Sequence, residues 1–354
     1  MNRQASLTPV MPDDLRAFYV ACFVKLGAPE SSAEMVAAAL IDADLTGTDT
    51  HGVARLPVYV SRIQAGGTNP TAEVTLIRDG GSTALLDGND GFGQVAATTA
   101  MRLAVERAST HGIASVAVRN SNHLGTLAHY SKMALPAGQI GFAVSGVAST
   151  IAPWGAAEAM LGSNPWSWAI PAKRHPPIVV DLANGVVTSS ITRGAADQGG
   201  TIPAGVALDA EGNPTTDGQA ALKGSILPIG GHKGYALTLV LEVLASVLPG
   251  AAYSYQVTRF ENPGTSKSIG HFMMAIDVAR FADPETFTAR VDDLIDHLRG
   301  AAKGEHQPGP RIPGEHSHSC VVERSRNGVP INDRNRERAI EVARQLGVED
   351  PFTT

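Results

Sequence analysis

The chain has 354 residues, of which 43% are hydrophobic and 18% are charged, so it can bury a sizeable core and has the length of about two domains. Its 28 Lys and Arg against 34 Asp and Glu give a formal net charge of −6, which argues against nucleic-acid binding, because phosphate contacts need clustered cations. The two cysteines, Cys22 and Cys320, form no CxxC pair, which argues against a disulfide scaffold and a thiolate zinc finger.

The sequence shows no membrane or export signal. No apolar segment follows Met1 closely, and the most apolar long stretch, 235–248, is interrupted by Glu242 and is too short to span a bilayer. We therefore expect no membrane partner and a cytoplasmic location.

The first 75 residues predict helices. One helix opens near Asp13, and a second follows the capping-box pattern of Ser31 and Glu34, with apolar residues recurring at helical spacing. A third carries Leu56 and Ile63 on one face.

Beyond this segment, short apolar runs alternate with helical patterns, which is typical of an α/β domain. We expect strands at 83–86, 113–118, 140–144, 167–170, 178–180 and 272–276, and helices at 92–110, 125–137 and from Tyr235. Helices near 284–298 and 333–346 finish the chain.

One glycine-rich run resembles a dinucleotide fingerprint. Residues 91–96 fit the pattern GxGxxA and open a helix, as in a Rossmann fold. In that fold the next strand ends in an acid that binds a ribose, whereas strand 113–118 ends in Arg119 and Asn120. A glycine-rich turn before a helix is therefore the better interpretation.

Two polar segments are candidates for substrate chemistry. Arg55 and Tyr59 share a helical face and could together bind a carboxylate, while His51 at the helix entrance could act as an acid or base. His123 lies in the polar loop 119–125 directly after a buried strand, and could donate a proton. The structural alternatives are a surface Arg, a half-buried Tyr, and a solvated loop with a capping Asn.

Three further segments have weaker signals. The run 230–234 places backbone N–H groups and a Lys before a helix, which suits an anion, although it could be a hinge. Asp181 follows a buried strand and could orient a His, bind a cofactor hydroxyl or cap a turn. His316, His318 and Cys320 alternate and would share one face of a strand, but no second cluster completes a metal site, so we expect no bound metal.

Taken together, these segments resemble the type 2 malate/L-lactate dehydrogenase family, which also includes ureidoglycolate, sulfolactate and diketogulonate oxidoreductases and cyclic imino-acid reductases. The matching runs occur in family order: 50–52 with Arg55, 86–88 with 91–94, 120–125, 152–155, 160–165, 180–183, 230–235 and 313–315. The resemblance implies an α/β fold with a non-Rossmann, mixed-sheet NAD(P)-binding domain. It also implies a homodimer with the active site near the interface. We divide the chain into a helical part, 1–75, the NAD(P)-binding domain, 76–277, and C-terminal helices, 278–354, that return to the helical part.

The resemblance also implies roles for individual residues. Arg55 would bind the substrate carboxylate, and His123 or His51 would exchange the proton. In some members Thr50, His51 and Asp181 would match a proposed Ser-His-Asp relay, with Thr50 standing where many members have Ser. The cofactor contacts would be His123, Leu124, Gly125, Asp181, Leu182, Ala183, His232, Lys233, Pro313, Gly314 and Glu315. His316 follows this last run where Arg is common, so the choice between NAD and NADP stays open.

The sequence therefore predicts an NAD(P)-dependent oxidoreductase that moves a hydride between nicotinamide and the α carbon of a small 2-hydroxy or 2-oxo acid. A reductase of cyclic 2-imino acids is the alternative on the same fold. A metal-dependent enzyme built on His316, His318 and Cys320 and a catalytically inactive binding protein are the alternatives from other classes.

Overall fold

The computed structural model describes residues 9–258, 262–304 and 309–352. Its centre is a seven-stranded mixed sheet in the order β2-β3-β4-β13-β5-β8-β9. The strands are β2 (Thr75–Asp79), β3 (Thr83–Asp87), β4 (Ile113–Ser121), β13 (Ile269–Asp277), β5 (Gln139–Ser145), β8 (Trp166–Ile170) and β9 (Ile178–Leu182).

Only one neighbouring pair in this sheet, β3 with β4, is parallel. Helix α4 (Gly93–His111) makes the crossover between these two strands. The central strand, β13, comes from late in the chain and pairs antiparallel with β4 and β5. A doubly wound fold would be mainly parallel, so the prediction of a mixed, non-Rossmann sheet is confirmed.

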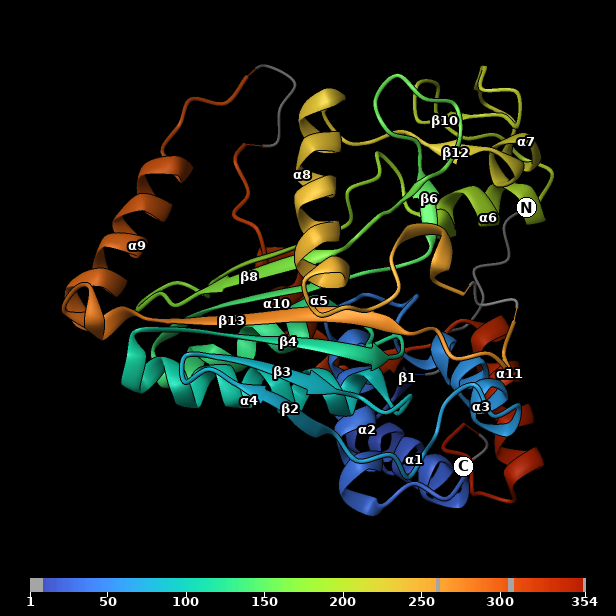
Figure 1. Ribbon diagram of the computed structural model, residues 1–354, viewed down its shortest axis with the longest axis horizontal. Coiled ribbons are helices and arrows are strands. Elements are labelled where there is room, and N and C mark those ends of the chain that lie inside the picture. The colour runs from blue at the N-terminus through green and yellow to red at the C-terminus, as the bar shows by residue number, and fades with distance from the viewer. Residues whose placement is uncertain (1–8, 259–261, 305–308, 353–354) are drawn as a thin grey trace.

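Helix α4 covers one face of the sheet (Figure 1). Its buried stripe consists of small side chains at helical spacing, among them Ala96, Ala100, Ala104 and Ala108. These alanines pack with sheet residues such as Val116 and Met273. Small side chains let the helix axis approach the sheet closely.

Segments from both ends of the described chain share a second core (Figure 1). It contains α1 (Pro12–Lys25), α2 (Glu30–Leu45), α3 (Leu56–Gln64) and α11 (Asp333–Leu346). The short strands β1 (Pro9–Val10) and β14 (Val329–Pro330) pair beside them. By contrast, α9 (Pro284–Arg299) packs its Val291 and Ile295 with Ile170 and Ile178 of the sheet. The division of the chain into three parts therefore remains a proposal, in which we now assign α9 to the sheet.

A smaller sheet lies above the large one in Figure 1, in the order β11-β10-β12-β6-β7. Its strands are β6 (Ser149–Ile151), β7 (Leu161–Gly162), β10 (Ala207–Leu208), β11 (Pro214–Thr215) and β12 (Ser225–Ile226). The remaining helices are α5 (Leu127–Ser131), α6 (Ser189–Asp197), α7 (Gly218–Lys223), α8 (His232–Glu242) and α10 (Glu315–Asn327). Short helical turns are η1 (Val53–Arg55), η2 (Lys132–Ala137), the π-helical η3 (Val243–Val247), η4 (Ser254–Gln256) and η5 (Val278–Arg280).

Several local expectations were wrong. Helix α2 begins directly after Pro29 without a side-chain cap, so Ser31 lies inside the helix and forms no capping box. Helix α8 begins at His232 rather than at Tyr235. Helices α6, α7 and α10 were not predicted, because each is short or mostly polar. No helix in the described ranges is both long and apolar enough to cross a membrane.

Candidate active site

A cleft of about 960 Å³ opens between the large sheet, the small sheet and the helical segments. Four of the parts of the chain that line it contain predicted site residues: the loop after α2, the end of β4, the end of β9, and the turn before α10. Its volume lies within the range of small-molecule and cofactor sites. The lining brings together predicted residues from all four parts: His51, Arg55, His123, Leu124, Gly125, Asp181, Leu182, Ala183, Pro313 and Gly314.

Two histidines lie against each other in this cleft. The ring centroids of His51 and His123 are 5.6 Å apart, and the ring planes are stacked at an angle of 26°. Thr50 Oγ1 forms a hydrogen bond of 2.8 Å with His51 Nδ1. Burial, aided by the charge of Arg55, lowers the pKa of His51 to about 3. His51 is therefore neutral at neutral pH.

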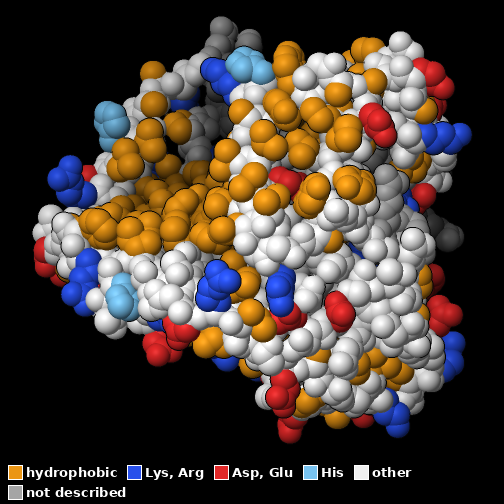
Figure 2. Space-filling view, viewed as in Figure 1, with side chains coloured by type: hydrophobic (Ala, Val, Ile, Leu, Met, Phe, Trp, Pro, Cys, Tyr) orange, Lys and Arg blue, Asp and Glu red, His pale blue; other side chains and the backbone are white. Residues whose placement is uncertain are grey.

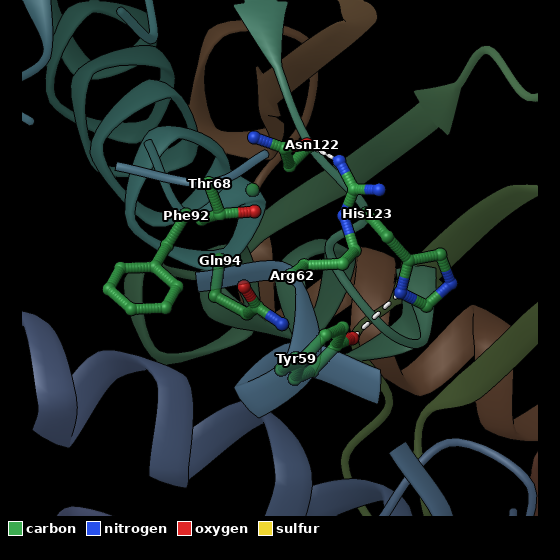
Figure 3. A pocket seen from close by; sticks show the side chains of 8 residues that line it. Tyr59, Arg62, Thr68, Phe92, Gln94, Asn122 and His123 are labelled. Carbon is green, nitrogen blue, oxygen red and sulfur yellow. Dashed lines mark hydrogen bonds between the residues drawn. The ribbon is translucent and has the colours of Figure 1, made fainter. Parts of the chain in front are cut away.

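The ring of His123 is oriented by two hydrogen bonds to its Nδ1 atom. The hydroxyl of Tyr59 lies 2.7 Å from Nδ1 (Figure 3). The backbone N–H of Gly125 donates to the same atom at 3.3 Å. An amide N–H can only donate, so Nδ1 is an acceptor and the proton of the neutral ring is on Nε2. Burial lowers the pKa of His123 well below its usual value, and the charge of Arg55 lowers it further.

Arg55 gives the site its positive charge. It ends η1, directly before α3, and lines the cleft beside both histidines. Burial lowers its pKa, and the nearby Arg193 and Arg338 lower it further. Arg193 and Lys267 also line the cleft, and such cations in a partly buried cleft attract an anionic ligand.

A buried cation supports the loop that carries His123. Arg62 on α3 is 2% exposed and donates to Asn122 Oδ1 at 3.1 Å (Figure 3). Arg62 also donates to the carbonyl oxygens of Gly67 and Thr265, and Asn122 donates to that of Gly91. The role of Arg62 is not predictable from the sequence, because its partner lies 60 residues away along the chain.

The glycine-rich run 91–96 serves this same loop. A Cβ atom on Gly93 would overlap the carbonyl oxygens of Asn122 and His123. The missing side chain therefore lets α4 begin directly against the histidine loop. This contact supports the interpretation of a glycine-rich turn and accounts for the glycine without a phosphate ligand.

Asp181 lies near the end of β9 and faces the cleft. Burial raises its pKa to about 6. Its Oδ2 atom accepts a hydrogen bond of 2.9 Å from the backbone N–H of Ala128. Within the described ranges, Asp181 and His51 share the cleft without a hydrogen bond between them, so the relay of Thr50, His51 and Asp181 stays a prediction.

The surroundings of Asp181 fit a nicotinamide dinucleotide. Backbone from Leu124–Gly125, Asp181–Ala183 and Pro313–Gly314 borders the cleft. Gly314 has a φ of +97°, and a Cβ atom there would lie 3.0 Å from Val179, so this turn packs tightly against β9. These three segments would hold the cofactor, and Asp181 could accept hydrogen bonds from its ribose hydroxyls.

Three predicted cofactor residues lie outside the cleft lining of this chain. His232 and Lys233 form the first turn of α8, where the ring of His232 is 6.1 Å from that of Trp154. Glu315 forms an ion pair with Arg299, and its carboxylate accepts from the backbone N–H of Ile312. Their role in cofactor binding therefore stays a prediction.

The segment considered for a metal is a helix rather than a strand. On α10, His316 and Cys320 share a face, with Nε2 and Sγ 3.7 Å apart, whereas His318 is turned away from them by the helical twist. No group of three or more His, Cys, Asp or Glu side chains in the described part of the chain is arranged to hold a metal ion. The three residues therefore do not share one face, as the alternating pattern predicted for a strand.

Comparison with known proteins assigns the chain to a family. Residues 10–338 match the family model described as malate/L-lactate dehydrogenase. The chain is 40% identical over 327 residues to the L-sulfolactate dehydrogenase of Methanothermobacter thermautotrophicus, covering 91% of this chain and 93% of that protein.

Solved structures agree with this match. The malate dehydrogenase of Entamoeba histolytica superposes with a TM-score of 0.93 at 32% identity, covering 98% of this chain and 100% of that one. The Δ1-piperideine-2-carboxylate reductase of Pseudomonas syringae pvar. tomato gives a TM-score of 0.86 at 28% identity, covering 95% and 99%. The chain belongs to the malate/L-lactate dehydrogenase family of oxidoreductases.

Proposed function

We propose that the protein is an NAD(P)-dependent dehydrogenase of small 2-hydroxy acids, acting between the hydroxy acid and its 2-oxo acid. The observation that carries this proposal is the placement of Arg55, His51 and His123 in one cleft beside the segments that fit a dinucleotide. The relatives named as malate and sulfolactate dehydrogenases support this substrate class.

Arg55 binds the carboxylate of the substrate through its guanidinium group, which can form two parallel hydrogen bonds with it. This places the α carbon and its oxygen near the stacked histidines. The bound nicotinamide supplies the hydride chemistry. The chain must then orient the acid, exclude water and handle one proton.

His123 is our first choice for that proton. The charge of Arg55 is one cause of the low pKa of His123, so a bound carboxylate that offsets this charge raises the pKa of the ring. The ring can then carry a second proton on Nδ1, with Tyr59 Oη turned to accept it and the 3.3 Å contact from the Gly125 N–H given up, and donate from Nε2 to the substrate oxygen. In the oxidative direction Nε2 takes the proton back. His51, with Thr50, is the second choice.

The alternative substrate is a cyclic 2-imino acid, such as piperideine- or pyrroline-2-carboxylate. It also offers a carboxylate to Arg55 and accepts its proton on nitrogen instead of oxygen. The structural similarity to a piperideine-carboxylate reductase is the observation that supports this second candidate.

The first test is binding and turnover. Purified protein is titrated with NADH and NADPH by fluorescence quenching, and 2-oxo acids and cyclic imino acids are then screened for loss of nicotinamide absorbance. We expect one cofactor to bind and one class of acid to be reduced. Binding of neither cofactor would contradict the proposal, and binding without turnover would favour an inactive binding protein.

Two variants test the assigned roles. His123→Ala should lower kcat about 10²–10⁴-fold, as expected for a general acid. Arg55→Ala should mainly raise KM for the acid, because it removes a contact to the substrate carboxylate. Arg102→Ala, on the exposed side of α4, is the matched control and should leave both constants unchanged. Wild-type turnover in His123→Ala would overturn the assignment of the proton donor.

We further propose a homodimer and a cytoplasmic location. The outer side of α8 and η3 exposes an apolar stripe made of Leu237, Val240, Val243, Val247 and Leu248 (Figure 2). The stripe contains no charged residue, so it can pack against its own copy across a two-fold axis without bringing like charges together. Cys22 and Cys320 are free thiols, which agrees with a reducing compartment.

A further inference from the structure

A buried carboxylate lies directly behind the loop that carries His51. Asp44, one residue before the end of α2, is 1% exposed. Its Oδ1 atom accepts from the backbone N–H of Val53 at 3.0 Å, and its Oδ2 atom accepts from the hydroxyl of Tyr19 at 2.6 Å. The carboxylate therefore joins α1 and α2 to the beginning of η1.

The loop between α2 and η1 is closed around this side chain. A Cβ atom on Gly52 would overlap the Asp44 carboxylate, so the loop backbone passes directly over it. On the other side, Arg324 of α10 donates to the carbonyl oxygen of Asp44 at 2.6 Å and forms an ion pair with Asp49 at 2.6 Å. The loop is thus attached to fixed elements at both ends.

Asp44 does not line the cleft, whereas the residues that the loop carries do. His51 directly precedes Gly52, which packs on the Asp44 carboxylate. Arg55 lies two residues after Val53, whose backbone N–H donates to that carboxylate. A shift of Asp44 would therefore move the carboxylate-binding Arg55 and the stacked His51 together. Misplacement of a reacting group by about 1 Å can cost about 10²-fold in rate.

We propose that Asp44 is a positioning residue of the active site, which sets the places of His51 and Arg55 by holding the Val53 amide and packing under Gly52. The proposal rests on the proposed dehydrogenase function for its kinetic readout. It adds a residue that touches neither substrate nor cofactor and acts through the loop 48–55.

An amide is the conservative replacement at this position. Burial raises the pKa of Asp44 to about 7, so the neutral acid is well populated near neutral pH. The neutral acid and an Asn side chain both offer one acceptor oxygen to Val53 and one donor to the oxygen of Tyr19. Alanine keeps neither, and serine is too short to reach the Val53 amide.

The kinetic test compares Asp44→Ala, Asp44→Asn and Leu40→Ala, a cavity variant in the core of the same helix. We expect Asp44→Ala to raise KM for the acid about 10-fold or more and to lower kcat, with the Kd of the cofactor unchanged. Asp44→Asn should restore both constants to within about 3-fold of wild type. Leu40→Ala should lower Tm and leave KM unchanged, because KM does not depend on the fraction of folded enzyme.

A spectroscopic readout keeps the test independent of turnover. Imidazole ¹H–¹⁵N spectra should show shifted His51 resonances in Asp44→Ala, restored in Asp44→Asn, while the resonances of His271, within the sheet, stay in place. If Asp44→Ala does not fold, Asp44→Ser replaces it. If the wild type is active, and Asp44→Ala keeps the wild-type KM and unmoved His51 signals, the positioning role is overturned. An inactive wild type would overturn the proposed function, and the His51 signals would still decide the role of Asp44.

Discussion

The hydroxyl of Tyr59 lies 2.7 Å from His123 Nδ1, although the sequence analysis assigned this tyrosine to the substrate. Tyr59→Phe removes one of the two donors to Nδ1 and leaves the N–H of Gly125. One such hydrogen bond contributes about 1 kcal/mol, so we expect kcat to fall about 5- to 10-fold while the Kd of the cofactor stays unchanged. Steady-state kinetics and cofactor titration measure both quantities. Tyr255→Phe is the control, because Tyr255 is 73% exposed. An unchanged kcat in Tyr59→Phe would show that the contact between Tyr59 and His123 does not serve the reaction.

His271 predicts a pH dependence of stability. Its ring is fully buried between Ser145 Oγ at 3.0 Å and Ser121 Oγ at 2.9 Å, and burial lowers its pKa to about 3. The unfolded chain binds this proton below a pH of about 6.5, whereas the folded protein does not bind it until about pH 3. The contribution of His271 to stability is therefore complete above pH 6.5 and declines by up to about 1.4 kcal/mol per pH unit below it.

His271→Asn tests this sign. The free energy of unfolding is measured by urea titration between pH 7.5 and pH 5 for both proteins. The variant should be less stable at pH 7.5, and the difference from wild type should shrink as the pH falls, because only the wild type carries the His271 titration. A difference that stays constant with pH would contradict the low pKa.

At the scale of elements, close packing between β5 and α5 depends on a glycine. A Cβ atom on Gly141 would overlap the carbonyl oxygen of Ser131, where α5 ends. We expect Gly141→Ala to destabilise the protein by roughly 2–3 kcal/mol, because the helix must shift away from the strand. Gly194→Ala on α6 is the matched control. No atom lies within 4 Å of its added Cβ, and helix propensity should stabilise it by up to about 1 kcal/mol. Urea titration measures the free energy of unfolding of both variants. Equal changes in Gly141→Ala and Gly194→Ala would rule out the packing explanation.

At the scale of the whole molecule, the apolar stripe on α8 and η3 predicts a dimer. Val240 is 56% exposed at its centre, and Figure 2 shows apolar side chains continuing from this stripe across the same face. Val240→Glu would place two carboxylates against each other across a two-fold axis, so we expect it to convert a dimer into monomers. Light scattering coupled to size-exclusion chromatography measures the mass. Ile77→Glu, on the edge strand β2 and 47% exposed in the wild type, should remain dimeric. A monomeric wild type would exclude the dimer.

Local patterns in the sequence were sufficient for much of the fold. The spacing of apolar residues predicted α1, α3, α4 and α11 within a few residues, because one buried helical face repeats along the chain. Strands β4, β5, β8 and β9 were predicted as apolar runs, with their ends one to three residues short. The polar loops after α2 and β4 contained His51 and His123, and the end of β9 contained Asp181; the structure places all three in one cleft.

Only the tertiary structure decided which of these segments meet. Strand β13 takes the centre of the sheet although it follows β9 by more than 80 residues, and α10 is a helix where the polar sequence has no apolar periodicity. The contacts of Tyr59 with His123, Arg62 with Asn122 and Asp44 with Tyr19 join residues 64, 60 and 25 positions apart. Periodicity records which face of an element is buried, whereas the partner of a buried donor depends on how distant elements pack. The sequence thus determined the elements and the chemical types of the site residues, and packing determined which atoms orient them.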